Sequence, residues 1–185
     1  ANRRTDDALF RLDMRVVDAV IAFSAQDARR IEEMGAPAFV SPLAQYSPPV
    51  DADAVARWKA LWSADGVPVV LFAGQIRPDK RLDLAIEASA LIEREHQLAV
   101  VGEDKGDLER CRELAAALGV QVSWTTEYVA LTDFVAILAA ADVIVCPYER
   151  ASQSGILALA RKLVDRREVS KPHGKSLRAA ATFAP

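Results

Sequence analysis

The chain has 185 residues, of which 51% are hydrophobic and 26% charged, and its net charge is −3 at pH 7. This composition predicts a soluble globular protein, and the charge excludes a general attraction to nucleic acid or anionic lipid. Two cysteines, Cys111 and Cys146, are too few for a disulfide framework and favour a reducing, cytoplasmic compartment. No apolar stretch reaches the roughly 18 residues of a membrane span, and no signal peptide is predicted.

Residues 1–50 are predicted to be the end of a preceding domain and an interdomain linker. A mixed helical pattern over 6–17 precedes a short apolar run at 19–23, which predicts a strand. Ser24 then has the character of an N-cap, with Asp27 as the acidic residue three positions later. Two helices and one strand cannot enclose a core, so this segment is expected to need a partner surface.

From residue 51 onward, predicted helices and strands alternate. The predicted strands cover 69–73, 98–101, 120–124 and 143–146, and the predicted helices cover 51–62, 84–92, 108–118, 131–141 and 152–164. This alternation argues for an α/β fold, a Rossmann-like parallel sheet with helices on both faces. The sequence therefore predicts one such domain over 51–164 and a divergent basic tail over 165–185.

The most informative stretch is Val69–Lys80, with the sequence VVLFAGQIRPDK. An unbroken apolar strand ends at Gly74, and a short turn leads into a helical pattern, which is the first half of a βαβ unit. Ligands of such sheets bind outside the carboxyl ends of the strands. Arg77 and Lys80, beside a turn that opens a helix, would offer charge and backbone N–H groups to anionic oxygens. A solvated loop with ordinary surface charges is the alternative.

A second loop of this kind lies within Cys146–Ala160, with the sequence CPYERASQSGILALA. Ser152, Ser154 and Gly155 would bring hydroxyl and backbone N–H groups to an anion at a helix start. Taken alone, the cluster is a weak signal and is more typical of a plain N-cap. Because both loops are expected at one edge of the sheet, together they would clamp a diphosphate.

These segments resemble the motifs of the carboxy-terminal domain of GT-B glycosyltransferases of family 4. The resemblance rests on Gly74–Lys80 with Asp83 and Ala88, on Val100–Gly102, on Ala140–Val143 with Pro147 and Tyr148, and on Gln153–Gly155 with Leu157. It extends over about Val69–Leu159. In addition, Val16–Leu43 is similar to the last helices and strand that precede the interdomain linker of the family.

The resemblance implies a donor-binding domain that takes a nucleotide-diphosphate sugar, transfers the sugar with retention, and needs neither a metal nor a cofactor. Lys80 falls at the family's diphosphate-binding lysine, and Gln75 replaces an arginine whose charge Arg77 would supply. Main-chain groups near Tyr128 and Val129 would meet the nucleobase. The implied donor-binding residues are Gly74, Gln75, Arg77, Lys80, Gly102, Tyr128, Val129, Glu149, Ser152, Ser154, Gly155 and Ile156.

The sequence also departs from the family pattern. Aligned through Gly155, the two hallmark glutamates fall at Ser152 and Ala160, so both carboxylates are missing, although Glu149 could replace the first. Alanine cannot accept the hydrogen bonds of the ribose, so Ala160→Glu is expected to tighten donor binding. Beyond Ala160 the family's next strand is absent from the pattern, and the basic end favours a solvated tail over a nucleic-acid or membrane patch.

Two functions stay open at this point, and no catalytic residue is assigned. The first is a glycosyltransferase, or its donor-binding half, with a nucleotide-sugar and a missing N-terminal acceptor domain as partners. The second is a non-catalytic nucleotide-sugar-binding or structural remnant. The lone histidines His96 and His173 predict no metal site. No nucleic-acid partner is expected, and peripheral contact with the inner face of the membrane stays open.

Overall fold

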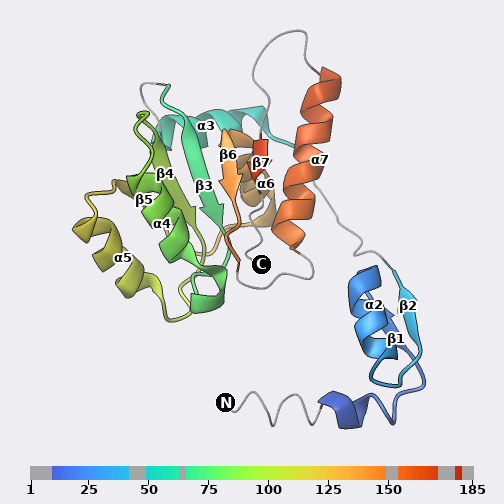
Figure 1. Cartoon of the computed structure of the whole chain (residues 1–185). Helices are drawn as coiled ribbons and strands as arrows, with labels where there is room; N and C mark the ends of the chain where they lie inside the picture. The colour runs from blue at the N-terminus through green and yellow to red at the C-terminus, as the bar shows by residue number, and fades with distance from the viewer. Residues whose placement is uncertain (1–9, 42–48, 63–65, 149–153, 171–177, 181–185) are drawn as a thin grey trace. The chain divides into compact units, whose positions relative to one another are not determined.

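The computed structural model describes residues 10–41, 49–62, 66–148, 154–170 and 178–180, with the side chains of the last helix described up to Leu163. The chain divides into two compact units, one formed by its N-terminal part up to Gln45 and one by the part from Tyr46 onward. Each unit is described by itself below (Figure 1). The domain boundaries predicted from the sequence stay predictions.

The N-terminal unit is a small βαβ element. It contains β1 (Val20–Ala22), α2 (Ala25–Glu32) and β2 (Ala38–Val40), and the two strands pair in parallel. The predicted cap of α2 is confirmed, because Ser24 Oγ accepts a hydrogen bond from the Asp27 N–H at 3.1 Å. The same hydroxyl donates to Asp27 Oδ2 at 2.7 Å. Before β1, only residues 10–13 of the predicted helix over 6–17 are helical among the described residues.

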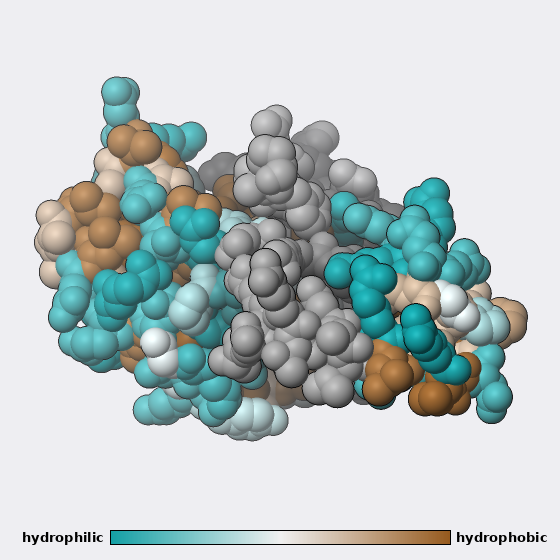
Figure 2. Space-filling model, turned by 60° about the horizontal axis from the view of Figure 1, so that its bottom comes forward, coloured by the Kyte–Doolittle hydropathy of each residue, from teal (hydrophilic) through white to brown (hydrophobic). Residues whose placement is uncertain are grey.

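The core of this unit is small, and much of its apolar surface is exposed. Five buried side chains form it: Met14, Ala22, Ala28, Ile31 and Ala36. By contrast, Ile21 of β1 is 67% exposed and Phe39 of β2 is 64% exposed. The exposed apolar residues of this unit appear in brown on the right of Figure 2. That a partner surface covers them stays a prediction.

The C-terminal unit is built on a five-stranded parallel sheet with the order β5-β4-β3-β6-β7. The strands are β3 (Val69–Ala73), β4 (Gln97–Val101), β5 (Val122–Thr125), β6 (Val143–Val145) and β7 (Arg178–Ala180). From the central β3 the chain adds β4 and β5 on one side, then returns to add β6 and β7 on the other. The strand order therefore reverses between β3 and β6, and the predicted Rossmann-like class is confirmed.

Helices cover both faces of this sheet. They are α3 (Ala52–Trp62), α4 (Leu82–Ala90), α5 (Leu108–Ala117), α6 (Leu131–Ala140) and α7 (Gly155–Ser170), with a short 3-10 turn η1 (Pro78–Lys80) before α4. α4 packs against α5, while α6 packs against both α3 and α7. Figure 1 shows α4 in front of the sheet and α6 behind it. The core between them includes Leu71 and Phe72, which are fully buried.

Two helix faces differ from the sequence prediction. α4 buries Leu82, Ala85, Ile86 and Ser89, whereas Leu91, part of the spacing that predicts the helix over 84–92, is 83% exposed. The reason is that Leu91 follows Leu82 by nine residues and so lies about 180° around the helix axis from the buried face. In α3, Trp62 is buried and Leu61 is 67% exposed, although spacing predicts that Leu61 shares one face with Val55 and Trp58.

The C-terminal end also differs from the prediction. The helix expected over 152–164 begins at Gly155 and continues to Ser170, and residues 149–153 lie outside the described part of the chain. Within the predicted tail, Arg178–Ala180 forms β7, which pairs in parallel with β6. Part of this basic segment therefore adds an edge strand to the sheet instead of forming a solvated tail.

Candidate functional site

The candidate site lies where β3 and β6 end, at the reversal of the strand order. The loop after β3 starts at Gly74, whose φ is +127°, a value that side chains disfavour. It continues through η1 to Arg81, which adopts the left-handed conformation with a φ of +53° and starts α4. The loop after β6 leads to α7. In a doubly wound sheet these are the two loops that diverge and leave a crevice for a ligand.

The loop after β3 is tied to the loop after β4 through Ile76. The Ile76 N–H donates to the Glu103 carbonyl oxygen at 2.9 Å, and the Lys105 N–H donates to the Ile76 carbonyl oxygen at 2.8 Å. The Ile76 side chain is fully buried in the core. This anchor fixes the backbone on which Gln75, which is exposed, and Arg77 are carried.

Arg77 is paired within its own loop. Its Nε lies 2.6 Å from Asp79 Oδ1, and its Nη2 donates to Asp79 Oδ2 at 3.0 Å. Because Asp79 already balances this guanidinium, the geometry gives no direct support to the interpretation that Arg77 supplies the charge missing at Gln75. That assignment stays a prediction.

Lys80 reaches across to the loop after β6. Its ammonium nitrogen lies 4.0 Å from the centroid of the Tyr148 ring. Tyr148 is only 3% exposed, and its hydroxyl donates to the carbonyl oxygen of Ala73, the last residue of β3, at 3.3 Å. Sequence reasoning used Tyr148 only as part of a motif and missed this contact. A large aromatic residue just after Pro147 was the available signal.

The start of α7 lies against the end of β3. A Cβ atom at Gly74 would stand 2.9 Å from Cδ1 of Ile156 and 3.5 Å from the Tyr148 hydroxyl. Gly155 is the first residue of this 16-residue helix, and Ser154, just before it, is half-buried. The structure thus brings Gly74, Lys80 and Ile156 together around Tyr148, and Gly102 lies against the backbone of Gly74 from the other side.

The remaining predicted site residues are more scattered. Tyr128 and Val129 lie in the loop between β5 and α6, at the same carboxyl edge of the sheet; Tyr128 is 90% exposed, while Val129 packs on the core. Glu149 and Ser152 lie outside the described residues. Their assignment to the site stays a prediction.

A charged network joins the starts of α4 and α5 beside the site. Asp83 accepts hydrogen bonds from Arg81 Nε at 3.0 and 3.2 Å. Arg110 donates to Asp107 at 2.6 and 3.0 Å and lies 3.9 Å from Asp83. Burial disfavours the charge of Asp83, but the hydrogen bond and charge of Arg81 outweigh burial, so the pKa of Asp83 is lowered. Asp107, at the N-cap position of α5, is only 4% exposed.

The Cys146 thiol at this edge is buried and protonated more firmly than a free thiol. Cys146 is 7% exposed, and burial raises the pKa of its thiol despite the nearby Tyr148 hydroxyl and Lys80 charge. Within the described ranges, no three side chains of the metal-ligating types come together. Among the same residues, no helix is long and apolar enough to cross a membrane.

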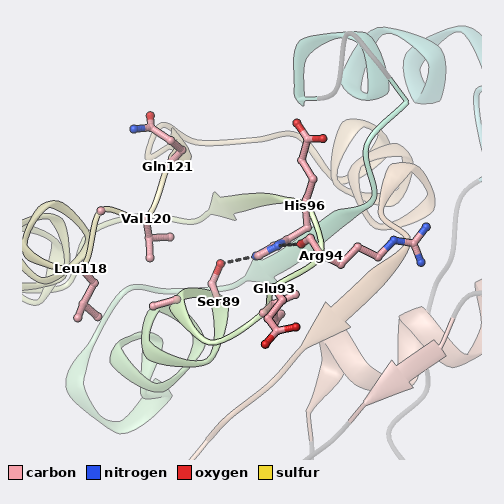
Figure 3. Close-up of a pocket in the computed structure, with 11 residues that line it drawn as sticks. Ser89, Glu93, Arg94, His96, Leu118, Val120 and Gln121 are labelled. Carbon is pink, nitrogen blue, oxygen red and sulfur yellow. Dashed lines mark hydrogen bonds between the residues drawn. The ribbon is translucent and has the colours of Figure 1, made fainter.

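A pocket of about 290 Å³ lies at the opposite edge of the sheet, where β4 and β5 begin. Figure 3 shows Ser89 pointing to His96 inside it, with 2.6 Å between Ser89 Oγ and His96 Nε2. His96 Nδ1 lies 2.8 Å from the Arg94 carbonyl oxygen and must be the donor, because a carbonyl only accepts. In the neutral ring Nε2 therefore accepts from Ser89. This pair ties the end of α4 to the start of β4.

Fold and site together define a Rossmann-like domain with a ligand edge at the reversal of its strand order. Residues 67–163 match the family described as Glycosyl transferases group 1. The chain belongs to this family, and the domain is of the GT-B type that the sequence resemblance implied. No curated protein sequence matches the chain significantly.

Solved structures with the same fold are distant in sequence. Sucrose-phosphate synthase from Thermosynechococcus elongatus has 21% identity and a TM-score of 0.72, over 87% of this chain and 42% of that one. HepE from Anabaena in complex with UDP and glucose has 15% identity and a TM-score of 0.72, over 88% and 47%. HepE in complex with UDP-glucose has 16% identity and a TM-score of 0.67, over 81% and 46%. The chain thus spans less than half of each of these structures.

Proposed function

We propose that this chain is the donor-binding half of a retaining glycosyltransferase that takes a nucleotide-diphosphate sugar without a metal ion. The observation that carries the proposal is that Lys80, in the loop after β3, contacts Tyr148, in the loop after β6, while Ile156 at the start of α7 lies against Gly74. An ammonium group and a helix N-terminus at one crevice both favour the oxygens of a diphosphate. That HepE is described in complex with UDP-glucose supports a donor of this chemical class.

The other residues of the proposed site extend from this centre. The diphosphate would lie between the loop after Gly74 and the start of α7 at Gly155 and Ile156. The nucleoside would extend along the carboxyl edge of the sheet toward Tyr128 and Val129, which follow β5. Tyr128, being 90% exposed, presents a free aromatic surface at this edge. A cytoplasmic location, where such donors are made available, is part of the proposal.

Transfer by this chain alone is not expected. An acceptor hydroxyl must be held at the sugar for transfer to occur, and the residues proposed here bind only the donor. The acceptor would bind on a second domain, of which residues 10–41 would be the end. We therefore expect donor binding with at most slow hydrolysis.

A non-catalytic binding protein is the second candidate, and Ala160 favours it. The family's second glutamate aligns with this residue, which is fully buried in the core on α7. The sequence-based expectation that Ala160→Glu tightens donor binding stays a prediction, and the burial of Ala160 in the hydrophobic core argues against it. The ribose would then lack its usual acceptor.

Calorimetric titration of the full chain with UDP, UDP-glucose and the corresponding GDP and ADP sugars tests the proposal. Lys80→Met should weaken binding of the preferred nucleotide sugar by about 1.5–3 kcal/mol, roughly 10- to 150-fold. Lys59→Met, which removes an exposed lysine on α3, is the matched control and should bind as the unmodified chain does. Equal affinities of the Lys80 and Lys59 variants would remove Lys80 from the site. Robust sugar transfer to mixed acceptors would exclude the non-catalytic candidate.

A further inference from the structure

We propose that Tyr148 is a positioning residue that holds the charged end of Lys80 at the diphosphate subsite without neutralising it. The inference rests on the proposed function, because it concerns the same crevice. It goes beyond that function by assigning a role to a residue three positions after the end of β6. It also explains why a buried aromatic side chain stands at this point.

Tyr148 is itself fixed at both ends of its side chain. Its backbone follows the short β6 strand, and its ring is almost completely buried, with 3% of the residue exposed. Its hydroxyl donates to the Ala73 carbonyl oxygen at 3.3 Å. The last paired residues of the two strands are Phe72 and Val145, so this hydrogen bond joins β3 to the loop after β6 just beyond their ladder. The ring is therefore a rigid platform.

The ammonium nitrogen of Lys80 lies 4.0 Å from the centroid of the Tyr148 ring. A cation on the face of an aromatic ring is attracted by the ring quadrupole, and the attraction grows when the pair is shielded from water. The lysine side chain is long and flexible, so a fixed platform reduces the number of positions that its charge occupies.

The ring differs in one important way from a carboxylate partner. Arg77, three residues earlier, is balanced by Asp79 at 2.6 Å. Lys80 forms no ion pair with a carboxylate among the residues that the structure describes. An aromatic ring holds an ammonium group by its π face and carries no net charge, so the full positive charge and the N–H donors remain for an anion. The Lys80–Tyr148 pair is thus ordered and still cationic.

Two measurements on the full chain test this role. The first is the proton chemical shift of the Lys80 ε-methylene group, assigned by its loss in Lys80→Arg. The ring current of Tyr148 should move this signal upfield in the unmodified chain and in Tyr148→Phe. In Tyr148→Leu the signal should return to the position of an ordinary lysine. An ordinary shift in the unmodified chain would overturn the inference without any variant.

The second measurement is a double-mutant cycle with UDP and inorganic diphosphate as probes and uridine as the phosphate-free control. Tyr148→Leu should weaken UDP and diphosphate binding by about three- to tenfold, and Tyr148→Phe should restore most of the affinity. Uridine binding should be the same in all variants. The Lys80→Met/Tyr148→Leu double variant should bind no more weakly than Lys80→Met alone, because Tyr148 acts through Lys80.

The outcomes separate this inference from the proposed function. If the unmodified chain binds UDP but Tyr148→Leu binds it equally well, the positioning role is overturned and the proposed function stands. Additive losses in the double variant, or an equal loss of uridine binding, would also overturn it. If the unmodified chain binds neither UDP nor diphosphate, both proposals fail. Should Tyr148→Leu not fold, as judged by circular dichroism, Tyr148→Met replaces it, since Met fills similar space without an aromatic ring.

Discussion

Gly102 and Gly74 touch through their backbones, where the chain leaves two neighbouring strands. A Cβ atom at position 102 would overlap the carbonyl oxygen of Gly74 and lie 2.6 Å from its carbonyl carbon. The Gly102 N–H donates to the Thr125 carbonyl oxygen at 2.9 Å, so Gly102 cannot move away without losing a bond to β5. The resemblance to the family implies that Gly102 is a donor-binding residue. The contact with Gly74 requires a glycine there without any ligand.

We predict that Gly102→Ala destabilises the C-terminal unit by about 1–3 kcal/mol, the usual cost of forcing an extra group into a packed site. Denaturant unfolding measures this change. Gly155→Ala is the control, because a Cβ at that helix start meets no atom within 4 Å. Its stability should be unchanged or slightly higher, since alanine is the better helix former. Equal stabilities of the two variants would contradict the contact between Gly102 and Gly74.

Ala160→Glu should destabilise the chain instead of restoring donor binding. Ala160 is fully buried within the core cluster that contains Leu163 and Ile144. A carboxylate there would be desolvated in an apolar environment, which should lower the free energy of unfolding by about 3–5 kcal/mol. Arg161→Glu changes the exposed neighbour on the same helix and should stay within about 0.5 kcal/mol of the unmodified chain. The free energy of unfolding of both variants checks this, and tighter donor binding by a fully stable Ala160→Glu would refute the placement.

Acid should weaken the C-terminal unit through Asp83. Its pKa is lowered in the folded chain, because hydrogen bonding and charge from Arg81 outweigh the effect of burial. A carboxylate whose pKa is lowered in the folded state stabilises the fold at pH values above its pKa in the unfolded state, which is about 3.9. This stabilisation is lost as the pH falls through the pKa of the folded state. Asp83→Asn should therefore cost about 1.5–3 kcal/mol at pH 7 and clearly less at pH 3. Urea unfolding at the two pH values tests this, and an equal cost at both would argue against it.

Alkali should weaken the same unit through Cys111. Burial, followed by the charge of Asp107, raises the pKa of its thiol from 9.0 to about 12. A thiol whose pKa is raised in the folded state contributes its full stability at pH values below its pKa in the unfolded state. That contribution declines as the pH rises from about 9 toward 12. Between pH 8 and pH 10 the loss should amount to about 1–2 kcal/mol. Cys111→Ala should lack this part of the pH dependence, and an unchanged slope in that variant would exclude Cys111 as the cause.

Local patterns in the sequence determined the elements and the family motifs. Val69–Ala73 is a strand with those bounds, because an unbroken β-branched and aromatic run can only be buried on both faces. Ser24 caps α2 because the hydroxyl reaches a backbone N–H three residues away. Gly119 ends α5 with a φ of +67°, as a left-handed cap should. Each of these depends on residues that are close together in the chain.

Only the tertiary structure decided which distant residues meet. Lys80 and Tyr148 are far apart in the chain and come together because β3 and β6 are neighbours at the reversal of the strand order. Spacing alone included Leu91 in the helical pattern, but α4 packs its opposite face, with Leu82 and Ile86, on the core. Likewise, no local pattern reveals that Gly102 must leave room for the Gly74 carbonyl or that Ala160 faces the core. Strand order and side-chain packing depend on how side chains are buried throughout the unit. The spacing of residues within a short segment carries no information about that burial.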